Sequence, residues 1–394
     1  MSWVIVRQFR WTTRTGADDY PRVEEVHPLS GRKRLPVNVA EVVHVNAVAP
    51  AGSARVRFDT RLDELRLLAN YLGVRPGRPV TLRQDGFRAS SPHVRRFVSE
   101  SFGLGMLTAA VQAAYEWNDG DPADFSALPM TLAASSAKRG VRPDLLFQAP
   151  GLLLAGEARG RSGKPPGSTR LPRERLDRLL PWAHVHRHPL VMTWAYLDGD
   201  GVVVDFFAPA DGVEWLSGAI GVPDPAAALR LPRAEQVALR EVDPAPAQQE
   251  LFPRPRPDQL SPLSLFEVGT GALGAVEEQL FDTAPPAPVT LAGRTARGRW
   301  APVDPVTGAR GSVLLAVLDE PLPPAEAAEV ARGWRRAAAG GGAAGGLGDD
   351  VEDRSDDGAD DRFAAGDLSV TVHGRTVVAL TPTRDGQPWD VLAD

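Results

Sequence analysis

Residues 142–161, RPDLLFQAPGLLLAGEARGR, contain two short apolar runs that are joined by a Pro-Gly turn. Each run has the length of a strand and is bounded by turn-forming residues, so the pattern predicts a β-hairpin. In an antiparallel pair, the start of the first strand lies beside the end of the second. Asp144 opens the first run and Glu157 ends the second. The sequence therefore predicts two carboxylates side by side at one end of an apolar hairpin.

Two adjacent carboxylates repel each other, and a hard divalent cation removes that repulsion. Mg²⁺ binds through one or two carboxylates and keeps water sites open for a phosphate. The pair Asp144 and Glu157 is therefore a candidate site for Mg²⁺ or Mn²⁺. The structural interpretation is that Asp144 belongs to a turn at a strand start and that Glu157 belongs to an exposed ion pair at a strand end. The metal-site and the structural interpretations both stay open.

The order Pro143-Asp144, apolar strand, Glu157-Ala158-Arg159 resembles the PD-(D/E)xK signature of restriction-endonuclease-like nucleases. The chain departs from that signature at Arg159, where the family usually has lysine. A lysine can position or deprotonate a water molecule, whereas arginine stays protonated and stabilises negative charge. The chain therefore matches the signature at its two carboxylate positions and differs from it at the lysine position.

The elements around the motif also fit that family's core, over about residues 91–210. The resemblance implies an α/β protein whose central domain has a restriction-endonuclease-like αβββαβ core. The elements expected around the hairpin are a helix at 91–117, an Arg-rich helix at 172–187, and strands at 188–197 and 202–207.

The resemblance implies metal-dependent phosphodiester hydrolysis of nucleic acid, with DNA a more suitable substrate than RNA. The metal ligands that the resemblance implies are Asp144, Glu157 and the main-chain carbonyl of Ala158, and the cofactor is Mg²⁺ or Mn²⁺. The family's usual roles imply bacterial defence or nucleic-acid processing, with a protein partner in a defence complex. The alternative is a catalytically degenerate nuclease-fold domain that binds nucleic acid or acts as a scaffold in a complex. A third class is an interaction scaffold without nucleic acid.

Only three of the 44 basic residues are lysines, namely Lys33, Lys138 and Lys164. Two of these flank the hairpin, so Lys138 or Lys164 is a candidate for the ammonium group that Arg159 does not supply. The competing interpretation is that both are solvated loop lysines.

A third acidic ligand is expected from the helix at 91–117, whose acids are Glu100 and Glu116. Their separation places them about 160° apart around a straight helix, so only one can face the site. Glu100 is favoured, and Gly103 and Gly105 could break the helix and change that phase.

Residues 155–178 carry seven basic residues against three acids, in a chain with net charge −6. This local excess of positive charge indicates phosphate contacts, or else a solvated helix face balanced by its own acids. The nucleic-acid-binding residues predicted from it are Arg161, Lys164, Arg170 and Arg173.

His184, His186 and His188 alternate, so on a strand they would share one face and could bind zinc. They fall at the expected end of a helix, where histidines interact favourably with the helix dipole. A zinc site there is the less favoured interpretation.

The division of the chain follows composition. Zero cysteines exclude disulfides and thiolate metal sites, and the absence of a signal-like segment or a membrane-length apolar run indicates a cytoplasmic protein that does not bind membranes.

An acidic, Gly-rich tract is expected to be disordered and could cover the basic patch. The predicted units are a strand-rich N-terminal module (1–90), the nuclease domain (91–220), a Pro-rich linker with one helix at 232–240 (221–262), and a small α+β C-terminal module (263–394) interrupted by the disordered tract at 339–362.

Overall fold

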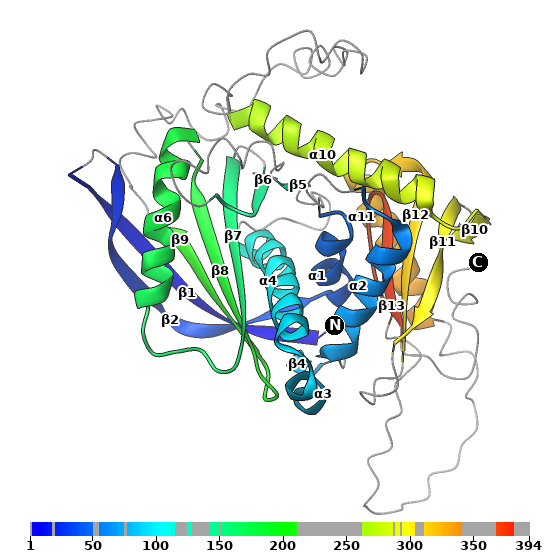
Figure 1. Ribbon diagram of the computed structural model, residues 1–394, viewed down its shortest axis with the longest axis horizontal. Helices are drawn as coiled ribbons and strands as arrows, with labels where there is room; N and C mark the ends of the chain where they lie inside the picture. The colour runs from blue at the N-terminus through cyan, green and yellow to red at the C-terminus, as the bar shows by residue number, and fades with distance from the viewer. Residues whose placement is uncertain are drawn as a thin grey trace, which may run out of the picture.

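Two β-sheets lie on either side of a layer of helices in the computed structural model (Figure 1). One sheet has seven strands and carries the predicted hairpin. The other has four strands and comes from the C-terminal third of the chain. The structure describes residues 2–17, 20–49, 55–74, 77–114, 124–127, 142–149, 152–186, 188–210, 262–286, 288–291, 294–303, 311–340 and 368–381.

The seven-stranded sheet has the order β2-β1-β9-β8-β7-β6-β5. β7 pairs parallel with β8, and β1 pairs parallel with β9, while the other neighbours are antiparallel. Its strands are β1 (Ser2–Thr15), β2 (Pro21–Val37), β5 (Asp124–Ala127), β6 (Leu145–Ala149), β7 (Leu152–Ser162), β8 (Leu190–Leu197) and β9 (Val202–Pro209).

Helices α4 (Pro92–Ala114) and α6 (Arg170–His186) cover opposite faces of this sheet. β7 shows the alternation, because Leu154 packs with the core that contains α4, and Ala155 packs with the core that contains α6. From α4 to β8 the chain runs helix, three antiparallel strands, helix and parallel strand. The helix, the hairpin, the second helix and the following strand lie in the predicted order, whereas β5 has no counterpart among the elements expected at particular residues.

The layer between the sheets contains α1 (Val39–Ala47) and α2 (Phe58–Tyr71), with α1 packed against both α4 and β13. α2 contacts β12 of the four-stranded sheet. A two-stranded sheet and a short helix follow α2 in the chain. These are β3 (Leu72–Gly73), β4 (Thr81–Leu82) and α3 (Gln84–Ala89).

The C-terminal sheet has the order β10-β11-β12-β13, all antiparallel. Helix α11 packs on β13, and α10 contacts α2 and the strands of both sheets. The elements are α10 (Pro262–Thr283), β10 (Pro288–Leu291), β11 (Arg294–Pro302), β12 (Ser312–Leu322), α11 (Pro324–Gly340) and β13 (Ser369–Thr381).

Two features differ from the sequence-based expectation for residues 1–90. β1 and β2 belong to the central sheet through the pairing of β1 with β9, whereas the sequence suggests a separate strand-rich module. The valine-rich run at 38–48, whose β-branched residues favour a strand, forms helix α1 instead. Its valines are buried on several sides between α4 and β13, and the Asn38 side chain caps the helix by accepting the Ala40 N–H. The predicted helix at 232–240 and residues 341–362 of the predicted disordered tract lie outside the described residues.

Candidate active site

The hairpin brings Asp144 and Glu157 side by side, as predicted, but Glu157 lies in the middle of β7 (Leu152–Ser162) and does not end that strand. Leu145 pairs with Gly156, and the Asp144 backbone N–H donates to the Gly156 carbonyl at 2.9 Å. The Asp144 Oδ2 accepts a hydrogen bond from the Ala158 N–H at 2.8 Å. These bonds hold the Asp144 carboxylate beside the part of β7 that carries Glu157.

Glu157 is a fully buried carboxylate, with 0% of its side chain exposed. It lies on the face of β7 that α6 covers. Its Oε1 accepts from Arg159 Nη2 at 2.7 Å and from Arg175 Nη2 at 2.5 Å. Arg175 Nε also donates to this atom, at 2.7 Å. Among the described residues, the other oxygen, Oε2, is buried and has no hydrogen-bond partner.

Burial raises the pKa of Glu157 to about 8, and the nearby Asp144 carboxylate contributes to this rise. Arg159 and Arg175 act in the opposite direction but do not cancel it. A further positive charge or a proton would therefore stabilise this carboxylate even with two guanidinium groups beside it. The atom that can bind the charge or the proton is the unpartnered Oε2.

This arrangement fits a divalent cation with few protein ligands. Mg²⁺ and Mn²⁺ bind oxygen, and Mg²⁺ commonly uses one or two carboxylates and fills its remaining positions with water. Asp144 and Glu157 supply two carboxylates, and the buried Oε2 is available. Within the described residues no group of three or more His, Cys, Asp or Glu side chains is placed to hold a metal, so a site here relies on these two.

Arg175 is a site residue that the sequence did not single out. It extends from α6 to Glu157, across from the strand that carries Arg159. Arg175 is one of seven basic residues in its segment, and no spacing rule distinguishes it from Arg170 or Arg173. Both guanidinium groups stay protonated, so they can stabilise negative charge and cannot act as a general base.

The prediction that Glu100 adds a third ligand is wrong for this geometry. α4 packs on the opposite face of β7, where a Cβ atom on Gly156 would touch Leu107 of α4, while the next residue, Glu157, contacts α6. Glu100 instead forms an ion pair with Arg96 at 2.9 Å. Glu116, the alternative, lies outside the described residues.

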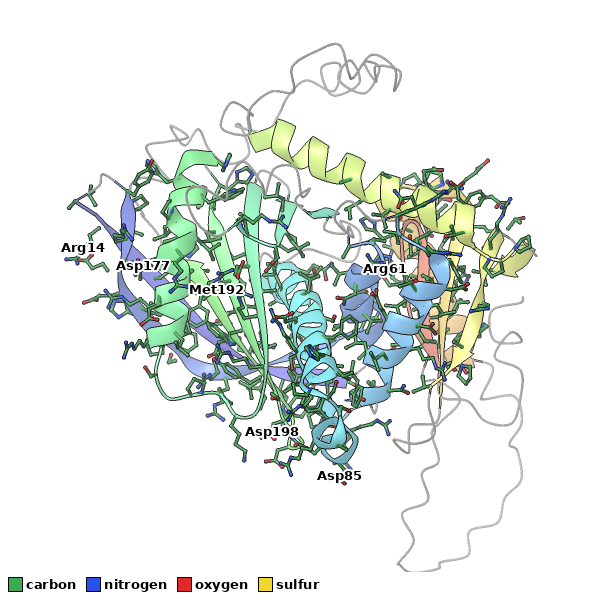
Figure 2. All side chains as sticks on the ribbon, viewed as in Figure 1. Arg14, Arg61, Asp85, Asp177, Met192 and Asp198 are labelled. Carbon is green, nitrogen blue, oxygen red and sulfur yellow. The ribbon has the colours of Figure 1, made fainter. Side chains whose placement is uncertain are left out.

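Lys164 does not approach Glu157. Its Nζ lies 3.1 Å from Asp200 and 3.9 Å from Asp198, beyond the end of β7 at Ser162. Glu157 and Lys164 are seven residues apart in the chain, about 20 Å along an extended strand. Figure 2 shows this separation, because Asp198 lies far down the sheet from Met192, the register partner of Glu157. Lys138 lies outside the described residues.

The four residues predicted to bind nucleic acid are placed differently from one another. Arg161 lies over the Trp194 ring, 5.0 Å from its centroid, on the same sheet face as Glu157. Arg170 pairs with Glu174 at 2.9 Å, and Arg173 donates to the Val23 carbonyl at 3.0 Å. With Lys164 paired as well, Arg161 is the predicted residue that faces the site.

The histidines lie at the end of α6 and before β8, as expected for the structural interpretation. The rings of His186 and His188 pack against Trp182 at 4.6 and 5.6 Å between centroids. The His188 Nδ1 lies 2.8 Å from the His186 carbonyl oxygen. Burial lowers the pKa of His188 to about 4, which is the environment of a neutral core histidine.

Comparisons with known protein families, with curated proteins and with solved structures give no match. The part of the chain that the structure describes has no helix with the length and apolar character needed to cross a membrane.

Proposed function

We propose that this protein is a metal-dependent nuclease whose central domain has the restriction-endonuclease-like fold. The observation that carries the proposal is the buried Glu157 Oε2 without a partner, beside a second carboxylate that the hairpin holds in place. A buried carboxylate oxygen that lacks a partner is costly unless something binds it. A divalent cation satisfies that oxygen and relieves the repulsion from Asp144.

Asp144 and Glu157 would hold the cation, with the carbonyl of Ala158 as the further ligand that the resemblance implies. When bound, Mg²⁺ or Mn²⁺ supplies an activated water and neutralises charge on a phosphate. Arg159 keeps a third of its side chain exposed beside Glu157, so it can contact a phosphate and stabilise the charge that develops there. Arg175 orients the Glu157 carboxylate from helix α6.

Cleavage assays with matched variants test the proposal. Linear, circular and single-stranded DNA and RNA are incubated with the full chain in Mn²⁺, beside Asp144→Asn, Glu157→Gln and the control Glu174→Gln. Glu174 is the acid that pairs with Arg170 on the exposed side of α6. Cleavage by wild type and by the control, and none by the two hairpin variants, is the expected result. Equal cleavage by all four proteins would reject the site.

A second candidate is a degenerate nuclease domain that binds nucleic acid without cutting it. The observation in its favour is that Glu157 has no exposed surface and already has two guanidinium partners. This candidate predicts nucleic-acid binding at low salt, where phosphate contacts are strongest, that is equal in wild type and in both hairpin variants, with no cleavage in Mn²⁺.

A further inference from the structure

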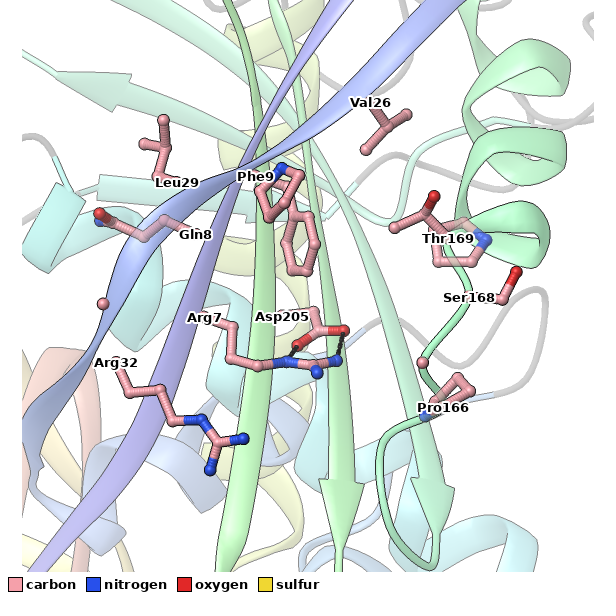
Figure 3. Close-up of a pocket in the computed structure, with 14 residues that line it drawn as sticks. Arg7, Gln8, Phe9, Val26, Leu29, Arg32, Pro166, Ser168, Thr169 and Asp205 are labelled. Carbon is pink, nitrogen blue, oxygen red and sulfur yellow. Dashed lines mark hydrogen bonds and ion pairs between the residues drawn. The ribbon is translucent and has the colours of Figure 1, made fainter.

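The described residues line a half-open cavity of about 500 Å³ between β1, β2 and the segment that leads into α6 (Figure 3). This volume lies in the range of small-molecule sites, which is about 300–1,000 Å³. The wall from the sheet includes Arg7, Phe9 and Asp205, and the opposite wall includes Ser168 and Thr169. The cavity is separate from the carboxylate pair at the end of the hairpin.

An irregularity in β2 shapes one side of the cavity. Arg7 pairs with Arg32 and Phe9 pairs with Pro28, so three residues of β2 lie opposite the single residue Gln8. Gly31 takes φ +94° in this bulge, a conformation that L side chains rarely adopt. Bulges bend a strand and redirect its side chains, and this one places Leu29 and Arg32 at the cavity.

The charges around the cavity sum to one positive charge. Arg7 makes a two-point ion pair with Asp205, with Nε to Oδ1 and Nη2 to Oδ2 both at 2.6 Å. The Arg7 Nη1 is not used in that pair, and Figure 3 shows it as the free end of the guanidinium. Arg32 has no ion-pair partner among the described residues. The cavity therefore offers one uncompensated guanidinium and one spare N–H group to an anion.

The remaining lining combines the polar side chains of Gln8, Ser168 and Thr169 with apolar side chains, among them Phe9, which is 7% exposed. Phe9 stacks on Phe207 with centroids 4.7 Å apart, and the Arg7 guanidinium lies 5.6 Å from the Phe9 ring. The large apolar residues that stay exposed in the described part of the chain are Leu29, at 42%, and Leu171, at 48%. Leu29 lines the cavity, and Leu171 adjoins its residue Pro172. Such a surface suits a flat aromatic ring better than a free ion.

The sheet register connects the cavity with the candidate active site. Directly paired residues share a face of a sheet, so one row of side chains crosses five strands on the face of Glu157. At about 4.8 Å per strand, Arg7 lies about 14 Å from Arg159. The row consists of Arg159, Trp194, Asp205, Arg7 and Arg32.

We infer that this cavity binds one nucleoside monophosphate unit of a single-stranded nucleic acid, with its phosphate on Arg32 and the Arg7 Nη1 and its base against Phe9 and Leu29. One phosphate in a strand carries one negative charge, which matches the charge of the cavity. The inference rests on the proposed function only for the role of the bound strand, which would run from this cavity along the row to Arg159. Binding in the cavity requires neither hydrolysis nor a metal.

Calorimetry on the full chain in EDTA tests the inference with three probes. The probes are dTMP, thymidine and inorganic phosphate, and anisotropy of a fluorescent twelve-residue oligo-dT is measured in parallel. The expected result is that dTMP binds at least about tenfold more tightly than either fragment, because only dTMP makes both the charged and the apolar contacts. Tight oligo-dT binding that free dTMP displaces would show that the unit is recognised within a strand.

The diagnostic variant is Arg32→Ala, with Lys33→Ala as its matched control. Lys33 is the next residue of the same edge strand and points to the other face, so it carries the same charge without lining the cavity. Arg32→Ala should weaken dTMP and oligo-dT binding about tenfold, and Lys33→Ala less than about twofold. Both residues are exposed, so neither change threatens the fold.

Three results would overturn the inference. They are equal binding of dTMP and inorganic phosphate, equal binding of dTMP and thymidine, and equal weakening by Arg32→Ala and Lys33→Ala. Asp144→Asn separates this outcome from that of the proposed function. If the cavity binds dTMP in both wild type and Asp144→Asn while neither cleaves nucleic acid, the inference stands and the nuclease proposal fails.

Discussion

Replacing Gly160 by alanine should destabilise the protein strongly, because β7 and α4 touch through their main chains at this point. A Cβ atom on Gly160 would lie 1.5 Å from the Ser99 carbonyl oxygen and 2.3 Å from its carbon. Ordinary contact begins near 3.4 Å, so the two backbones would have to separate by about 2 Å. A side chain could rotate away from such a clash, whereas the main chain of a helix cannot.

Overpacking a core usually costs about 1–3 kcal/mol. A clash between two backbones belongs at or above the upper end of that range, so we expect Gly160→Ala to lower the free energy of unfolding by about 3 kcal/mol or more. Urea unfolding followed by tryptophan fluorescence measures it. Gly274→Ala is the matched control, since Gly274 lies exposed in α10 and a Cβ atom there would have no neighbour within 4 Å. That control should stabilise the helix by about 0.5–1 kcal/mol. A loss below about 1 kcal/mol for Gly160→Ala would show that α4 does not cross β7 this closely.

Three further predictions concern buried charges and histidines. Arg175→Met should lower the free energy of unfolding by about 3–5 kcal/mol, because it leaves Glu157 with one guanidinium partner. Arg170→Met removes a partner from an exposed ion pair, so it should lower that free energy by less than about 1 kcal/mol in the same urea assay. Arg7→Met should destabilise the protein by a similar amount, because it leaves buried Asp205 unpaired. The double variant Arg7→Met/Asp205→Leu should recover most of that loss, measured by thermal unfolding. No recovery would argue against an ion pair there. Burial lowers the pKa of His188 to about 4 from 6.5, so the unfolded chain binds the proton first, and the contribution of His188 to stability falls as the pH drops from 6.5 toward 4, by about 1.4 kcal/mol per pH unit. Burial lowers the pKa of His44 to about 3, which adds a slope of the same sign, so His188→Asn should reduce the slope of the unfolding free energy by about 1.4 kcal/mol per pH unit and leave the His44 contribution. An unchanged slope would contradict the burial of a neutral His188 ring.

The hairpin and its acids could be predicted from sequence because the information is local. Strand length, the Pro-Gly turn and antiparallel pairing all lie within residues 142–161, and they place Asp144 beside Glu157. The long helix α4 and the Arg-rich helix α6 are also confirmed, since the spacing of apolar residues along a helix is a local signal.

The features that could not be predicted depend on distant contacts. The sequence favours Glu100 as a site residue because it is acidic and upstream, but α4 packs on the other sheet face, where Gly103 and Gly160 lie at the close crossing with β7. The valines of 39–47 suggest a strand, and burial on several sides of a helix suits the same residues. Arg175 reaches Glu157 from another element, so its role becomes visible only when α6 is packed on β7.

Two glycines of α4 give a second example of a feature that depends on distant contacts. Gly103 and Gly105 suggest a possible break in the helix, but α4 is continuous through both. A Cβ atom on Gly105 would lie 1.9 Å from the Val42 carbonyl of α1. The two glycines therefore allow β7 and α1 to approach α4 closely, which is a packing requirement that the sequence of the helix alone does not reveal.

Mn²⁺ binding measured by electron paramagnetic resonance tests the central claim most directly, because it reports the cation site without requiring the right nucleic acid. The full chain is titrated beside Asp144→Asn, Glu157→Gln and the control Glu174→Gln. The account predicts one bound Mn²⁺ in wild type and in the control, and loss of that ion in both hairpin variants. No bound Mn²⁺ in wild type, or the same binding in all four proteins, would contradict a metal site at Asp144 and Glu157.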